Sequence, residues 1–262
     1  MIGVTSASDT QHPALPRIRQ ITLDHPWQWL AAGWKDLTVS LKYSLSYGVI
    51  FFLVSLLLTL GLIYGNTFFI IPPLAAGFFL VAPVLGLGLY KISASLEQNQ
   101  PVSFGQILTA WRANPVYLGG MCVVLVFILL VWMMIANLVF ALFFDQPIPT
   151  WENFIPKVFL SGESAAFLFW GIASGGLMAA FTFAISAITV PLLMDRDIDL
   201  VRAMQTSVQA VRMNWRPMLL WACLITMFVG VGLVTFYIGL IVTMPLVGHA
   251  TWHAYRDLVE PD

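Results

Sequence analysis

Charged residues are scarce in this chain. Only 10% of its 262 residues are Asp, Glu, Lys or Arg, whereas 59% are hydrophobic and the mean hydropathy is +0.85. A soluble domain carries about 25% charged residues. So few charges cannot cover a water-exposed surface, so the composition predicts a protein embedded in the lipid bilayer. The net charge of −1 offers no electrostatic basis for binding nucleic acid, and no such partner is expected.

Cysteines and catalytic motifs are also sparse. The two cysteines, Cys122 and Cys223, each lie inside an apolar run without a Cys-x-x-Cys neighbour, which favours small buried hydrophobic residues over a redox or metal site. The sequence has no phosphate-binding loop, nucleophile elbow or paired-carboxylate site, so we expect no enzymatic activity. Ionisable residues are missing at hydrocarbon depth, which disfavours ion-coupled transport.

Long apolar runs are abundant. About 20 such residues span a bilayer, and six runs qualify, which predicts an all-α polytopic membrane protein. The last two runs have no polar break, but a single helix of their combined length would exceed the hydrocarbon thickness, so a hairpin is predicted. Residues 1–16 are predicted to form a disordered tail and residues 17–259 a single membrane domain. The six predicted transmembrane helices are Ser44–Tyr64, Phe68–Lys91, Val116–Phe143, Ala165–Met194, Pro217–Thr235 and Tyr237–His253.

Basic residues flank these runs asymmetrically. The positive-inside rule assigns the side richer in Lys and Arg to the cytoplasm. One side carries Lys157 together with Asp145, Glu152 and Glu163. We therefore expect a protein of the bacterial inner membrane with both termini cytoplasmic. The basic residues assigned to the cytoplasmic side are Arg17, Arg19, Lys35, Lys42, Lys91, Arg112, Arg196, Arg202, Arg212, Arg216 and Arg256.

An internal threefold repeat is predicted. Apolar residues recur at one-sided helical spacing in 26–37, 103–112 and 199–212, each just before an odd-numbered run. The even-numbered runs share a proline, at Pro83, Pro191 and Pro245. We expect three units, approximately 24–97, 101–197 and 198–259, each a cytoplasmic amphipathic interfacial helix followed by a transmembrane hairpin. The units would be related by an axis along the membrane normal.

The strongest candidate for chemistry is the segment Gly248–Asp257. His249 and His253 are four residues apart and hence on one helical face, which suits a haem or metal site. No third ligand stands at matching spacing, and an interfacial helix end meeting lipid headgroups is the alternative. The acidic residues of 195–199 suit Mg²⁺ or, alternatively, the N-terminus of the helix that follows.

Three patterns carry a family resemblance. They are Gly33-Trp34-x-Asp36-Leu37, the Arg-x-Asn-Pro-like helix starts, and Gly-His-Ala-Thr-Trp-His-Ala-Tyr-Arg-Asp at 248–257. Over about residues 17–259 the chain resembles a family of bacterial integral membrane proteins of unknown function. Some members are labelled as related to subunit I of cytochrome c oxidase, but that label implies no activity here. Such a subunit needs about a dozen spans and several buried histidines, whereas this chain has four histidines.

The function expected is that of a non-catalytic scaffold, accessory subunit or assembly factor, with the bilayer and a membrane protein such as a respiratory complex as partners. The alternatives are a small-molecule or lipid permease with proline-kinked helices, and a haem- or metal-handling protein using His249 and His253. No cofactor is expected outside that last alternative. The candidate functional or interfacial residues are Trp34, Asp36, Arg112, Asn114, Arg212, Asn214, His249, Trp252, His253, Tyr255, Arg256 and Asp257.

Overall fold

The computed structural model describes residues 15–144, 150–160, 162 and 164–261. Within these residues the secondary structure is helical, apart from an antiparallel bridge between Ile18 and Val259. Asp145, Glu163 and residues 1–14 of the predicted tail lie outside the described residues. The helices are α1 (His25–Val39), α2 (Leu41–Tyr64), η1 (Phe68–Ile70), α3 (Ile71–Leu85), α4 (Leu87–Glu97), α5 (Phe104–Leu108), η2 (Ala110–Ala113), α6 (Pro115–Phe143), α7 (Trp151–Ile155), η3 (Pro156–Leu160), α8 (Ala165–Ser186), α9 (Thr189–Asp195), α10 (Leu200–Met213), α11 (Trp215–Val234) and α12 (Leu240–Leu258).

The described residues contain five helical segments long and apolar enough to cross a membrane. α12 is not among them, because its second half carries His249, His253, Arg256 and Asp257. The described part of the chain is thus all-helical with five candidate spans, and the sixth span stays a prediction. The five segments are Leu41–Tyr64, Phe68–Glu97, Pro115–Phe143, Ala165–Asp195 and Trp215–Val234.

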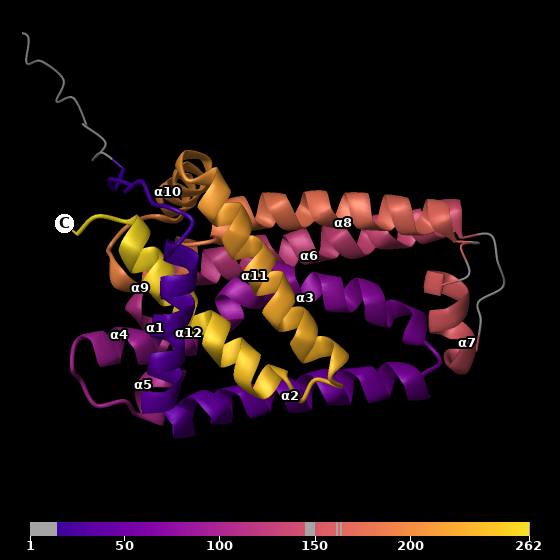
Figure 1. Ribbon diagram of the computed structural model, residues 1–262, viewed down its shortest axis with the longest axis horizontal. Helices are drawn as coiled ribbons and strands as arrows, with labels where there is room; N and C mark the ends of the chain where they lie inside the picture. Colours follow the sequence, from indigo (N-terminus) through magenta and orange to yellow (C-terminus); the bar gives the residue numbers. More distant parts are fainter. Residues whose placement is uncertain (1–14, 145–149, 161, 163, 262) are drawn as a thin grey trace, which may run out of the picture.

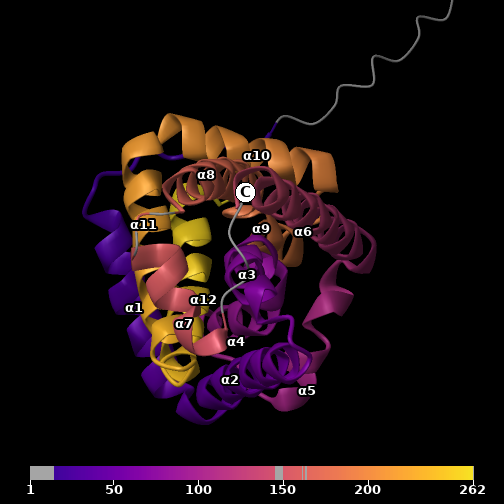
Figure 2. The same cartoon turned by 90° about the vertical axis from the view of Figure 1, so that its right-hand side faces the viewer.

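The helices form an elongated bundle with two different ends (Figure 1). α2, α3, α6 and α8 run along its length, and α11 and α12 run obliquely to them. α1, α4, α9, α10 and the chain's C-terminus gather at one end, which we call the polar end, while α7 lies at the other. α1 lies across the long helices rather than along them. Seen along the bundle, α12 and α3 lie inside a ring of the other helices (Figure 2).

Two predicted transmembrane helices are each divided into two consecutive helices. The predicted helix over 68–91 is α3 followed by α4, with Gly86 between them and Pro83 near the end of α3. The predicted helix over 165–194 is α8 followed by α9, and Pro191 lies in the first turn of α9. Proline has no backbone N–H to bond the preceding turn, which favours a break at these places.

Helices also occur where the three amphipathic segments were predicted. α1 and α10 match the first and third within a few residues, and Asp199 caps α10 by accepting the N–H of Arg202 at 3.0 Å. The second, predicted as one helix over 103–112, is instead the short α5 followed by the 3₁₀ helix η2. Its predicted start is correct, because the Ser103 hydroxyl accepts the N–H of Gln106 at 3.3 Å.

The main hydrophobic core lies toward the polar end, where α1, α6, α9, α11 and α12 meet. Trp29 of α1 and Trp221 of α11 pack edge to face with ring centroids 5.5 Å apart. The outward faces of α2, α6 and α8 expose large apolar side chains instead, as lipid-facing helices do. Cys122 of α6 and Cys223 of α11 are both exposed, so the expectation that they are buried is wrong.

Candidate functional site

The predicted candidate segment, residues 248–257, forms the buried second half of α12. It packs against α1, α2, α4 and α9. Two glycines permit this close approach: a Cβ on Gly33 would meet the backbone of Ala250, and one on Gly248 would meet the Leu89 side chain. Because α12 is enclosed this way, its polar side chains must find partners within the protein.

His249 is completely buried and bonded at both ring nitrogens. Its Nε2 lies 2.8 Å from the Ser44 hydroxyl of α2, and its Nδ1 lies 2.8 Å from the Ser93 hydroxyl of α4. Ser44 also lies 2.8 Å from the Ser40 hydroxyl, which donates to the Asp36 carbonyl at 2.7 Å. A neutral imidazole donates from one nitrogen and accepts at the other. In His249, serine hydroxyls occupy both the donor and the acceptor nitrogen.

His253 pairs with Asp36 one helical turn further on. Its Nε2 lies 2.8 Å from an Asp36 carboxylate oxygen, and both side chains are largely buried. Burial alone would raise the pKa of Asp36. The hydrogen bonds from His253 and Ser93, with the nearby charges of both histidines, outweigh burial and lower that pKa below its usual 3.8. Asp36 is thus held as a carboxylate that links α1 to α12.

Trp252, Tyr255 and Arg256 bind two carboxylates at the ends of other helices. Glu97, the last residue of α4, accepts the Trp252 indole N–H at 2.9 Å and the Arg256 Nε at 3.0 Å. Asp195, the last residue of α9, accepts the Tyr255 hydroxyl at 2.6 Å and an Arg256 guanidinium nitrogen at 3.2 Å. Arg256 therefore joins α4, α9 and α12 in one charged group.

Asp257 connects the same helix to α1. Its carboxylate accepts the indole N–H of Trp29 at 2.9 Å and lies 3.9 Å from Nε2 of His25. The chain ends meet nearby, because the Arg19 N–H donates to the Leu258 carbonyl and the Glu260 N–H donates to the Arg17 carbonyl. The C-terminal part of α12 is therefore bonded to α1, α2, α4 and α9. We call the bonded side chains Asp36, Ser44, Ser93, Glu97, Asp195, His249, Trp252, His253, Tyr255, Arg256 and Asp257 the α12 network.

The two candidate asparagines have a different role. Asn214 is buried at the start of α11, where it accepts the Ile21 N–H and donates to the Arg19 carbonyl, both at 2.9 Å. Asn114, at the start of α6, donates to the Ile198 carbonyl at 3.4 Å. Each asparagine thus binds the segment that leads into a helix at the polar end, α1 for Asn214 and α10 for Asn114.

The remaining candidates lie outside the α12 network. Trp34 is 51% exposed on the outer face of α1. The Arg112 guanidinium lies 5.6 Å from the ring of its neighbour Trp111, and Arg212 is exposed in the last turn of α10. These residues share a position at the polar end but do not join one site.

Several members of the α12 network were not among the predicted candidates. Ser44 and Ser93 gave no signal, because a serine in an apolar helix satisfies its hydroxyl on its own backbone as readily as on a distant partner. Asp195 gave a weak signal, since it is a carboxylate that directly follows an apolar run, whereas Glu97 follows the mixed segment 91–96 and gave none. Their pairing with Arg256 depends on the tertiary arrangement.

The geometry of the network fits a metal or haem poorly. Both His249 nitrogens are bonded to serines, and the Nε2 of His253 is bonded to Asp36. Within the described part of the chain, no three His, Cys, Asp or Glu side chains are grouped as metal ligands. In the acidic segment 195–199, Asp195 binds Tyr255 and Arg256 while Asp199 caps α10. These side chains serve helix packing and capping.

Comparison with known proteins gives one match. Residues 70–195 match a family described as a predicted integral membrane protein, DUF2189. The expected resemblance to a membrane family of unknown function is confirmed over these residues, which include α3 to α9. The match leaves out the motifs at 33–37 and 248–257 that carried part of the predicted resemblance. No significantly similar protein was found among curated proteins or solved structures.

Proposed function

We propose that this chain is a non-catalytic scaffold, accessory subunit or assembly factor of the bacterial inner membrane. The observation that carries this proposal is the α12 network, in which the candidate reactive groups are bonded to one another. Side chains held this way position helices. The outer face of α1, in contrast, carries Trp27 and Trp34, each about half exposed and seven residues apart on one helical face. Exposed aromatic side chains of this kind are enriched where membrane proteins meet partners or headgroups.

The charge distribution supports the orientation that the proposal needs. Of the twelve Lys and Arg residues, Lys157 alone lies beside α7, and the other eleven lie on segments of the polar end or leading into it. By the positive-inside rule the polar end is cytoplasmic. α11 leaves this end and α12 returns to it (Figure 1), so we propose that the two form the third hairpin and that both chain termini are cytoplasmic.

Contacts between helices support three related units. The first helix of each proposed unit packs on the returning helix of another: α1 on α12, α5 on α4, and α10 on α8 and α9. The relation is cyclic, as expected for three units around an axis along the membrane normal. Asn114 and Asn214 repeat one role in two of the units, since each binds the segment that enters the next unit around this axis.

The two alternative functions have less support. A permease needs a path through the bundle, whereas fully buried Trp221, Trp252 and Tyr255 fill its interior at the polar end. A haem- or metal-handling protein that uses both histidines needs an available nitrogen on each imidazole, and the bonds to Ser44 and Ser93 occupy both nitrogens of His249. We therefore propose that no cofactor is bound there.

Capture of partners from membranes tests the scaffold proposal. The chain should be purified in mild detergent as wild type, as the double variant Trp27→Ala/Trp34→Ala, and as the control Trp170→Ala, which removes an exposed tryptophan of α8. We expect the wild type and the control to retain a membrane protein partner, with respiratory-complex subunits as the expected class, and the double variant to lose it. A double variant that still retains the partner would contradict the proposal. So would the failure of all three proteins to retain any partner.

A further inference from the structure

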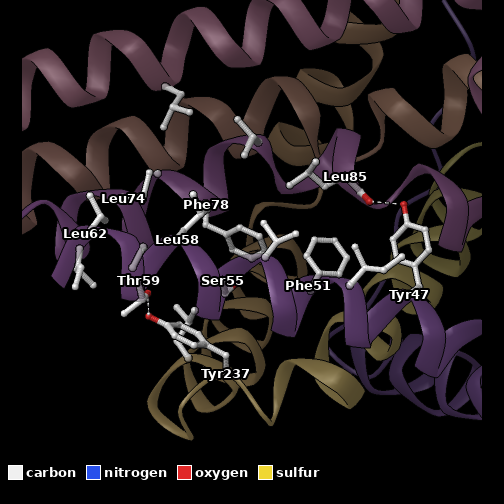
Figure 3. Close-up of a pocket in the computed structure, with 18 of the residues that line it drawn as sticks. Tyr47, Phe51, Ser55, Leu58, Thr59, Leu62, Leu74, Phe78, Leu85 and Tyr237 are labelled. Carbon is white, nitrogen blue, oxygen red and sulfur yellow. Dashed lines mark hydrogen bonds between the residues drawn. The ribbon is translucent and has the colours of Figure 1, made fainter. Parts of the chain in front are cut away.

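An apolar groove runs between α2 and α3. Its volume is about 490 Å³, and its lining also includes Leu129 of α6 and Tyr237 of the turn before α12. Figure 3 shows side chains of α2 and α3 projecting into it from both sides, with Tyr47 near one end and Leu62 near the other. Both helices belong to candidate membrane spans, so the groove lies at hydrocarbon depth.

Three hydroxyl groups on the wall of the groove, those of Tyr47, Thr59 and Tyr237, have partners within the protein. The Tyr47 hydroxyl donates to the Leu85 carbonyl at 2.7 Å, and the hydroxyls of Thr59 and Tyr237 are 2.6 Å apart (Figure 3). These bonds leave a wall that is almost entirely hydrocarbon. An occupant is therefore recognised by apolar contact along the groove, and any polar group it carries must lie at an end.

The length of the groove suits a chain-like occupant. Tyr47 and Leu62 are fifteen residues apart on one helix, which corresponds to about 22 Å at the usual rise. This is longer than one leaflet of hydrocarbon, about 15 Å, and shorter than the full core of about 30 Å. One extended acyl chain fits such a slot, whereas a compact ligand would leave most of it empty.

The Lys42 ammonium lies about one helical turn beyond the end of the groove that Tyr47 marks. Tyr43 and Phe104, four residues before the groove residues Tyr47 and Leu108, pack their rings together with centroids 4.8 Å apart. The exposed Lys42 ammonium lies 5.8 and 5.7 Å from these two rings. Among the described residues no carboxylate lies within ion-pair distance of Lys42. The charge expected of the occupant at this end is therefore negative.

We propose that the groove binds one acyl chain of an anionic phospholipid, whose phosphate is bound by Lys42. The lipid lies along α2 with its headgroup at the polar end and its chain directed toward Leu62. This site is separate from the α12 network and from the outer face of α1, so it stands or falls independently of the scaffold proposal.

Native mass spectrometry of the full chain in detergent tests the proposal. The probes are phosphatidylglycerol and phosphatidylcholine with identical acyl chains. Ala75→Phe places a ring in the groove, and Ala173→Phe makes the same change at an exposed alanine of α8 outside it. We expect wild type and Ala173→Phe to retain one phosphatidylglycerol, and Ala75→Phe to retain it at least about tenfold less, because several methylene contacts are lost.

Two further variants keep the test decisive. Ser55→Phe fills the groove from α2, so a folding failure of Ala75→Phe leaves a second blocked groove to measure. Lys42→Gln should lower the preference for phosphatidylglycerol over phosphatidylcholine about fivefold without abolishing chain binding. Equal lipid retention by wild type and the folded groove-filling variants would overturn the site. A lipid-free dimer that both Phe variants abolish would assign the groove to a second copy of the chain instead.

Discussion

The two faces of α1 differ in burial, and the same difference separates the polar end from the lipid-facing sides of the bundle. Toward the bundle, Trp29 is almost fully buried and bonded to Asp257, while Trp34 on the opposite face is half exposed. On a larger scale, the α12 network bonds polar side chains to one another at the polar end, and the outer faces of α2, α6 and α8 expose apolar ones along the length of the bundle.

This contrast shows how a chain with few charges uses them. Carboxylates and basic groups at the ends of α4, α9 and α12 bond to each other, so the polar end is held by directional interactions. The apolar faces need none, because lipid satisfies them. The fold is therefore expected to be most sensitive to substitution where α12 is enclosed and least sensitive where helices face lipid.

The largest expected effect comes from the two tryptophans of α1. Trp29→Ala removes a buried ring and the hydrogen bond to Asp257, and should lower the free energy of unfolding by about 3–5 kcal/mol. Trp34→Ala, its matched control on the exposed face, should cost less than about 1 kcal/mol. SDS titration in mixed micelles measures both. Similar losses for the two variants would remove the distinction between the faces.

A glycine pair on α2 tests the same contrast along one helix. A Cβ on Gly48 would collide with the backbone of Ile241 in α12, which cannot move aside, whereas one on Gly61 would meet no atom within 4 Å. Gly48→Ala should therefore destabilise by about 1–3 kcal/mol through overpacking. Gly61→Ala should be neutral or stabilising by up to about 1 kcal/mol. Thermal unfolding in mild detergent decides between them, and a tolerated Gly48→Ala would show that α2 does not approach α12 this closely.

The Asp36–His253 pair gives a smaller effect with a defined pH dependence. The pKa of Asp36 in the folded protein lies below its usual 3.8, so its contribution to stability is complete above that value and is lost as the pH falls through the lowered pKa. Asp36→Asn should cost about 1–2 kcal/mol near neutral pH. The difference from wild type should shrink below about pH 4. A difference that stays constant into strong acid would contradict this role for the carboxylate.

The sequence predicted much of the fold because its strongest signals are local. Apolar runs located all five candidate spans, and Ser103 and Asp199 located helix starts through their side-chain caps. The sequence did not predict where two helices are divided. The break at Gly86 and the split of 103–112 into α5 and η2 have only weak signals in the composition. The burial of α12 was not predicted, because enclosure is a property of neighbouring helices.

The candidate site was predicted in part for the same reason. The motif 248–257 identified the network residues on α12 itself, and a second motif identified Asp36. Its partners Ser44, Ser93, Glu97 and Asp195 come from three other helices, and single residues on separate apolar runs carry no mutual signal. The role of His249 changes accordingly, from a proposed ligand to a residue bonded between two serines.

A double-mutant cycle between Ser44 and His249 tests most directly whether the α12 network holds the polar end together. The free energy of unfolding should be measured for wild type, Ser44→Ala, His249→Phe and the double variant. Each single change removes the hydrogen bond between these two buried side chains and should cost about 1–3 kcal/mol. The double variant should cost less than the sum by about 1 kcal/mol or more. Strictly additive losses, or a His249→Phe variant as stable as wild type, would contradict the account.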